Sequence, residues 1–213
     1  MKKGKFFVLE GLDGSGKTEV ISRLKMDFPN FLYTREPGGS EFGEMVRGVL
    51  LDAKSKNVPP LPLLLGFMSS RASHVQELVL PALTRGQSVV SDRFDTSTFA
   101  FQLFGQENRK LEDVFWYLRK EILKNTSVEY IYLRITPDIA RQRKKNRKSN
   151  NHFDKQTDKY HQRVFEGYEN FFRNIKSDKN KTSLHKSRFN IIDGSLDRET
   201  VYQNVLTCIK KAK

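Results

Sequence analysis

Residues 11–18 could hold a chain of phosphates. They read Gly-Leu-Asp-Gly-Ser-Gly-Lys-Thr, which fits the pattern G-x-x-x-x-G-K-[ST], and they lie between an apolar run and a stretch with helical spacing. Such a loop directs backbone N–H groups at phosphate, and the following helix adds partial positive charge. Lys17 is expected to hold the β- and γ-phosphates, and Thr18 a Mg²⁺ ion. The residues expected to contact the nucleotide are Gly11, Leu12, Asp13, Gly14, Ser15, Gly16, Lys17 and Thr18.

A second group of candidate residues follows the apolar run Val89-Val90-Ser91. A strand that ends in aspartate is typical of the second signature of P-loop NTPases, whose carboxylate organises Mg²⁺. Asp92 is therefore a candidate metal ligand beside Thr18, and Arg93 would point into the same cleft. The alternative is an Asp–Arg pair that only closes a strand. The P-loop favours the functional interpretation because it requires such a partner.

Two further clusters carry polar and aromatic groups. Arg35, in Thr-Arg-Glu-Pro-Gly-Gly at 34–39, could bind phosphate with two parallel donors, although such a turn needs no function. Phe67 and Arg71 are four residues apart, so a helix would place them on one face. There the ring could stack on a nucleobase and the arginine could donate to a base carbonyl. The alternative for Phe67 is ordinary core packing.

Strand and helix patterns alternate along the chain, which predicts an α/β fold. Such alternation implies a five-stranded parallel sheet covered by helices on both faces, with ligands at the carboxyl ends of the strands. The expected strands are 5–10, 31–34, 88–91, 129–135 and 189–192. The prolines at 59 to 62 are expected to interrupt helical structure, and Pro137 is expected to be a first helical residue. The expected helices are 18–28, 41–51, 63–84, 96–104, 111–123, 138–148, 158–175 and 198–210.

The composition limits the class of protein. A chain of 213 residues with 37% hydrophobic residues suits one compact domain, and no apolar run is long enough for a bilayer. Cys208 is the only cysteine, and no signal-peptide pattern opens the sequence, so we expect a cytoplasmic protein. The net charge of +13 would suit nucleic acid, an anionic membrane or small anionic substrates. The excess of Lys and Arg over Asp and Glu is concentrated in residues 141–188, and no recognised nucleic-acid motif accompanies this basic stretch.

Taken together, these motifs resemble those of the bacterial thymidylate kinases. The matching features are residues 11–18 and 34–39, Phe67 with Arg71-Ala72 and His74-Val75, Asp92-Arg93-Phe94, and Ser97 with Ala100-Phe101-Gln102. The resemblance is strongest over 1–102 and continues more weakly through Ile135-Thr136-Pro137-Asp138. It implies a single P-loop kinase domain over 1–213, with the three-layer fold of nucleoside monophosphate kinases. The implied reaction transfers the γ-phosphate of ATP to dTMP, with ATP and Mg²⁺ as cofactors.

The resemblance also implies roles around the acceptor base. Phe67 resembles the ring that stacks on thymine, and Arg71 resembles the donor to thymine O4. Ser97 and Gln102 resemble the polar contacts around the base. Phe101 stands where many members of the family carry tyrosine, so a hydroxyl group near the sugar is missing.

Other roles concern the sugar and the phosphates. Asp13 resembles the carboxylate that binds the sugar 3′-hydroxyl of the acceptor. Arg93 resembles the arginine that binds the acceptor phosphate, with Arg35 and Arg47 as further ligands. The residues expected to take part in catalysis are Lys17, Arg93, Asp13 and Arg147.

The resemblance further implies a flexible lid at about 143–156. One kind of thymidylate kinase carries a basic residue in the P-loop, where this chain has Gly14, and the other kind supplies arginines from the lid. The basic residues in that region are Arg141, Arg143, Lys144, Lys145, Arg147 and Lys148. The lid usually contains an Asp-Arg pair followed by an acidic residue, and the corresponding stretch here, Asn151-His152-Phe153-Asp154, lacks that pair. Arg143 and Arg147 are the favoured lid cations.

Alternatives remain at this point. A related kinase could use another pyrimidine monophosphate, and the net charge leaves room for a nucleic-acid-associated P-loop ATPase. For the kinase we expect dTMP and ATP as partners, with no nucleic acid and no membrane. The resemblance also implies a homodimer formed through the region of residues 63–83.

Overall fold

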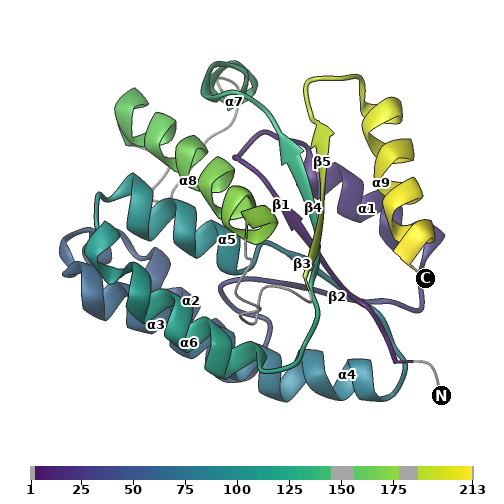
Figure 1. Cartoon of the computed structure of the whole chain (residues 1–213), viewed down its shortest axis with the longest axis horizontal. Coiled ribbons are helices and arrows are strands. Elements are labelled where there is room, and N and C mark those ends of the chain that lie inside the picture. The colour runs from purple at the N-terminus through teal and green to yellow at the C-terminus, as the bar shows by residue number, and fades with distance from the viewer. Residues whose placement is uncertain (1–2, 145–155, 178–186, 213) are drawn as a thin grey trace.

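The computed structural model describes residues 3–144, 156–177 and 187–212, which form a three-layer α/β fold (Figure 1). All neighbouring strands are parallel, in the order β2-β3-β1-β4-β5. The predicted five-stranded parallel sheet is therefore confirmed. The strands are β1 (Phe6–Glu10), β2 (Leu32–Arg35), β3 (Val89–Asp92), β4 (Glu129–Arg134) and β5 (Arg188–Asp193).

Helices cover both faces of the sheet. In Figure 1, α1 and α9 lie on one face, whereas α3, α5, α6 and α8 lie on the other. The α-helices are α1 (Lys17–Asp27), α2 (Glu41–Leu51), α3 (Pro60–Ser73), α4 (Leu80–Thr84), α5 (Asp95–Thr98), α6 (Glu112–Leu123), α7 (Pro137–Lys144), α8 (Asp158–Ser177) and α9 (Arg198–Ala212). Shorter helical segments are η1 (Ala53–Asn57), η2 (His74–Val79), η3 (Phe99–Gly105) and η4 (Arg109–Leu111), of which η2 and η3 are π-helical.

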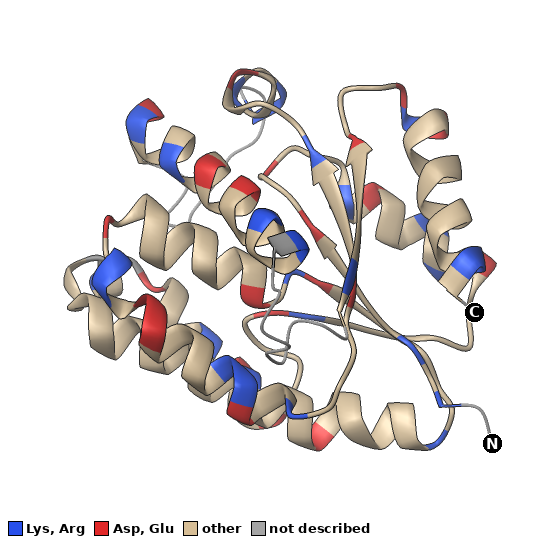
Figure 2. Cartoon of the chain, in the orientation of Figure 1, with Lys and Arg blue, Asp and Glu red and all other residues tan. Residues whose placement is uncertain are grey.

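The sheet separates two apolar cores, as the strand sequences require. Alternate side chains of a strand point to opposite faces. Phe7 and Leu9 of β1 therefore pack with Val20 of α1 and Val205 of α9, whereas Val8 belongs to the core on the other face. All five residues of β1 are buried because helices cover both faces of the sheet, and the first four are apolar, as is typical of such a parallel strand. Most charged positions fall on the outer helices (Figure 2), and no helix among the described residues could cross a membrane.

Two predicted helices differ from the structure. The helix expected at 63–84 begins at Pro60 and is divided into α3, η2 and α4. The expected interruption of helical structure at 59–62 was wrong. Pro60 and Pro62 lie in the first turn of α3, where a missing N–H group breaks no helical hydrogen bond. The helix expected at 96–104 is α5 followed by the π-helix η3. Pro137 does begin α7, and residues 145–148 of the expected helix lie outside the described residues.

A buried ion pair ties α5 to α6. Arg119 Nε donates to Asp95 Oδ2 at 2.6 Å, and both side chains are fully buried. Tyr130 of β4 donates to the same carboxylate at 2.7 Å and accepts from Arg119 NH2 at 3.1 Å. Charged groups away from water need such complete pairing. The network therefore fixes α5, the element that follows Arg93, against the sheet.

Replacing Arg119 tests this network. Arg119→Met should lower the free energy of unfolding by about 3–5 kcal/mol, because it leaves the Asp95 carboxylate buried without its cation. Arg198→Met is the matched control, since Arg198 pairs with Glu19 at 3.2 Å on the surface, with 84% of its side chain exposed. That change should cost less than about 1 kcal/mol. Urea unfolding measures the free energy of unfolding of both variants. Equal losses for Arg119→Met and Arg198→Met would contradict a stabilising role of the buried ion pair.

Candidate active site

The P-loop joins β1 to α1 and is held in place by its glycines. Gly11 has a φ of 144°, and a Cβ there would lie 2.5 Å from the carbonyl oxygen of Leu133. Gly16 has a φ of 100° and caps the N-terminus of α1, with Lys17 as the first helical residue. Backbone N–H groups at a helix start form an anion-binding site. The structure thus places this loop at the carboxyl end of β1, as predicted.

Lys17 lies folded against its own loop. Its Nζ donates to the carbonyl oxygens of Gly11 at 2.9 Å and Leu12 at 3.1 Å. Burial and the nearby charge of Arg93 lower the pKa of Lys17 to about 8. An anion bound beside this ammonium would favour its charged form.

Asp92 is the last residue of β3 and lines the same cavity as the P-loop. Its Oδ1 is buried and has no hydrogen-bond partner among the described residues. A buried carboxylate oxygen without a donor suits a divalent cation, either directly or through water. No group of three or more acidic, histidine or cysteine side chains in the described ranges could hold a metal by itself. The residues therefore fit an ion that Thr18 and Asp92 share with phosphate oxygens.

Arg93 directs its side chain between these elements from a left-handed backbone, with a φ of 68°. Its NH1 donates to Gly11 O at 3.0 Å, to Ser97 Oγ at 3.0 Å and to Tyr168 Oη at 2.9 Å, and its NH2 contacts Asp13 Oδ1. Burial alone would lower the pKa of Arg93, but the nearby acidic groups, with Asp13 the strongest and Asp92 and Glu10 behind it, together outweigh burial and raise the pKa. Arg93 is thus a fixed cation.

A cavity of about 120 Å³ lies beside Arg93. Arg71 forms one wall and is itself held in place: its Nε donates to Glu36 Oε2 at 2.8 Å, and its NH2 donates to Thr98 Oγ1 at 2.7 Å. The rest of the lining combines aromatic and polar groups, as a site for a planar polar ring requires. The lining residues are Asp13, Glu36, Pro37, Arg47, Leu51, Phe67, Arg71, Arg93, Phe94, Ser97, Thr98, Phe101 and Gln102.

A larger cavity of about 800 Å³ lies over the P-loop. Its lining joins the loop to α7 and to the segment after β5. The two cavities share Asp13 and Arg93, so a ligand in one would lie next to a ligand in the other. The lining residues are Asp13, Gly14, Ser15, Gly16, Lys17, Thr18, Glu19, Val20, Asp92, Arg93, Arg143, Lys144, Gly194, Leu196, Arg198 and Val201.

Most predicted site residues meet at these cavities. Arg47 lines the smaller one and donates to Pro37 O at 2.6 Å. Arg35 is not in either lining, and its guanidinium pairs with Glu44 at 3.0 Å with more than half of the side chain exposed. Arg147 lies outside the described residues.

Arg143, the other expected lid cation, lies on α7 within the described residues and contacts the P-loop. Its NH1 donates to Gly14 O at 3.2 Å and to Gly194 O at 2.8 Å. A Cβ at Gly14 would lie 3.3 Å from both Ala140 O and Arg143 Cβ. The absence of a side chain at Gly14 thus leaves room for α7 to approach the loop.

Sequence reasoning missed several residues of the site. Glu10 could have been noticed, because it is an acidic residue at the end of an apolar strand just before the P-loop. His74, whose Nδ1 is 2.8 Å from Glu36 Oε1, was matched as part of a motif without a role. Tyr168 has no local signal, since only the packing of α8 brings it to Arg93.

A P-loop on a parallel sheet, with a second cavity beside its phosphate end, defines a nucleoside monophosphate kinase. The family model described as thymidylate kinase matches residues 9–202. The thymidylate kinase of Thermoanaerobacter sp. (strain X514) is 34% identical over 216 residues and 98% of both chains, and that of Nitrosospira multiformis is 36% identical over 172 residues, with 78% of this chain and 82% of that protein covered. The chain belongs to the thymidylate kinase family and is therefore an ATP-dependent phosphotransferase that acts on dTMP.

A solved structure shares the fold. The thymidylate kinase of Ehrlichia chaffeensis superimposes with a TM-score of 0.70 at 23% identity and covers 98% of this chain and 99% of its own. This likeness confirms the predicted P-loop kinase architecture.

The pKa of Lys17 predicts how ATP affinity depends on pH. Because this pKa is lowered to about 8, the ammonium is fully charged only below that pH and loses its charge as the pH rises. The dissociation constant for ATP should therefore increase about tenfold per pH unit above 8. Titration calorimetry from pH 7 to 9.5 measures it. Lys17→Met should bind weakly without this inflection, and a constant affinity in the unaltered protein would contradict the assignment.

Proposed function

We propose that, for the transfer of the γ-phosphoryl group of ATP to dTMP, ATP lies over the P-loop and dTMP lies in the smaller cavity. The observation that carries this assignment is the pair of cavities that share Asp13 and Arg93. Two anionic phosphates must come together for the transfer, so a fixed cation at the junction is the required feature.

The smaller cavity suits the base and sugar of dTMP. Phe67 offers a ring for stacking, and Arg71 is a donor held by Glu36 and Thr98, which suits the O4 carbonyl of thymine. Ser97 and Gln102 supply further polar contacts to the base. Asp13 lines both cavities and, in this proposal, accepts from the sugar 3′-hydroxyl.

The phosphate of dTMP would lie against Arg93. Its NH2 now contacts Asp13 Oδ1, and an incoming phosphate would compete for it. Arg47 lines the same cavity, and Arg35 would have to leave Glu44 to take part. A guanidinium binds phosphate with two parallel donors, which also orients it for in-line transfer.

Lys17 and the loop amides hold the donor phosphates in this proposal. Mg²⁺, held by Thr18 and Asp92, would neutralise charge on the phosphate oxygens when bound. Arg143 and Lys144 line the donor cavity from α7, so they supply positive charge at the side where Gly14 has none. Arg147 and the lid at about 143–156 stay predictions, because residues 145–155 lie outside the described residues. The cytoplasmic location also stays a prediction.

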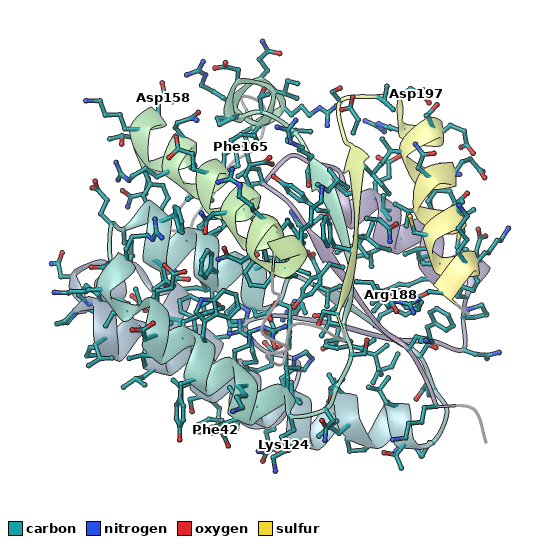
Figure 3. All side chains as sticks on the ribbon, in the orientation of Figure 1. Phe42, Lys124, Asp158, Phe165, Arg188 and Asp197 are labelled. Atoms are coloured by element: carbon teal, nitrogen blue, oxygen red, sulfur yellow. The ribbon has the colours of Figure 1, made fainter. Side chains whose placement is uncertain are left out.

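Exposed apolar side chains on α2 and α3 support a homodimer, and of these only Leu65 falls within residues 63–83, the region expected from the resemblance. Phe42 lies at the outer edge of the molecule (Figure 3) with 46% of its surface exposed. Exposed apolar patches of this kind favour association. The other large apolar residues exposed on these helices are Met45, Val49, Leu61 and Leu65.

A comparison of acceptors tests the assignment. The kcat/KM should be highest for dTMP and at least about 10²-fold lower for dCMP, since Arg71 would face an amino group in place of O4. Coupled ADP release with dTMP, dUMP, dCMP, dGMP and AMP measures it. Turnover of dCMP or a purine nucleotide as fast as dTMP would reject the proposed acceptor.

Replacing the P-loop lysine tests the donor site. Lys17→Ala should lower kcat about 10²- to 10³-fold without unfolding the protein, because it removes a cation that stabilises charge in the transition state. Lys25→Ala, an exposed lysine of the same helix, is the control and should keep normal turnover. Near-normal turnover by Lys17→Ala would disprove the role of this loop.

A further inference from the structure

The NH1 group of Arg93 is enclosed by three acceptors of the protein interior. Gly11 O, Ser97 Oγ and Tyr168 Oη all lie within 3.0 Å of it. The NH2 group instead faces Asp13 at the junction of the cavities. One edge of the guanidinium is thus fixed by the protein interior, which leaves the other edge for an anion.

Tyr168 brings a neutral acceptor to this cluster from α8. Its ring is fully buried, and its Oη lies 2.8 Å from Ser97 Oγ and 3.2 Å from Glu10 Oε2. Arginine only donates, so the phenol oxygen accepts from Arg93, and its single proton is left to donate to one of the other acceptors, such as Ser97 Oγ or Glu10 Oε2. Burial, together with the charge of Glu10, raises the pKa of Tyr168, so the hydroxyl stays protonated.

Glu10 is the buried anion behind Tyr168 and Ser97. Its Oε1 accepts from the backbone N–H of Phe94 at 2.8 Å and of Ser97 at 3.2 Å, and its Oε2 accepts from Ser97 Oγ at 2.7 Å. Burial raises the pKa of Glu10, and the positive charge of Arg93 opposes that shift. This side chain therefore fixes the start of α5 and offers Tyr168 an acceptor oxygen.

The position of Tyr168 is set by close packing of α8. At the preceding residue, Gly167, a Cβ would lie 2.7 Å from Ala100 Cα of η3, so only glycine allows this approach. On its other side the Tyr168 ring stacks on Tyr132 of β4, with centroids 5.3 Å apart and 10° between the planes. These contacts leave the hydroxyl group little freedom to move away from Arg93.

We propose that Tyr168 is a positioning residue for the acceptor phosphate, acting with Glu10 through Arg93. The inference rests on the proposed function, in which Arg93 binds that phosphate. By holding NH1, Tyr168 keeps NH2 directed at the junction of the cavities, where it now contacts Asp13. Loss of the hydroxyl should weaken binding of dTMP and leave binding of ATP unchanged.

Removing one hydroxyl group tests this role. Tyr168→Phe should raise the KM for dTMP about tenfold, the scale of one charge-assisted hydrogen bond, with the KM for ATP unchanged. Tyr132→Phe is the matched control, because its ring belongs to the same stack but its hydroxyl contacts Glu169 at 3.2 Å. It should keep the KM for dTMP. Steady-state kinetics with each substrate varied give both values, and thermal unfolding confirms that both variants fold.

A double-mutant cycle with Arg93→Lys separates this inference from the proposed function. If Tyr168 acts through Arg93, the effect of Tyr168→Phe on the KM for dTMP should disappear in the Arg93→Lys background. Suppose that Arg93→Lys by itself weakens dTMP binding, as the proposed function requires. The inference about Tyr168 is then overturned if Tyr168→Phe and Tyr132→Phe have equal KM values for dTMP. It is also overturned if Tyr168→Phe raises this KM as much in the Arg93→Lys background as in the unaltered protein. Normal dTMP kinetics of Arg93→Lys would overturn the acceptor role of Arg93.

Discussion

The contact between Arg93 and Asp13 is the interaction on which the rest of the site depends. The two residues are distant in sequence, but each follows the carboxyl end of a strand, and the parallel pairing of β1 with β3 sets Leu9 opposite Asp92. That register brings the P-loop and the Asp-Arg turn side by side. The opposite charges then fix the point at which both cavities open, so the strand order determines where phosphates can meet.

Holding this point requires buried charge elsewhere. Arg71 is paired with Glu36, Arg119 with Asp95, and Arg93 lies near Glu10, all largely out of contact with water. Burying each of these charges has a desolvation cost. In return, each charged group holds its partner in a fixed orientation, which an apolar side chain could not do. The left-handed backbone of Arg93 is a further departure from the preferred conformation. Buried charge is therefore gathered around the acceptor cavity and the start of α5, while most of the sheet is ordinary apolar packing.

The sequence predicted the sheet well because each strand is a short apolar run followed by polar residues. It predicted the P-loop, Asp92 and Arg93 because these chemical groups lie at fixed positions just after strands. It predicted the π-helical segments η2 and η3 as regular helix, since one extra residue in a turn leaves no mark in the apolar pattern. Tyr168 could not be predicted at all, because its place depends on the fit of Gly167 against Ala100.

The crowding around Gly14 bears on how such an enzyme can change. A side chain there would meet α7 and would also have to adopt a φ of 87°. A Cβ there would lie 3.3 Å from Ala140 O and from Arg143 Cβ, so α7 would have to shift by a few tenths of an ångström to admit it. A basic residue on the loop would therefore change the approach of the helix that carries Arg143, which couples the two sources of positive charge at this position.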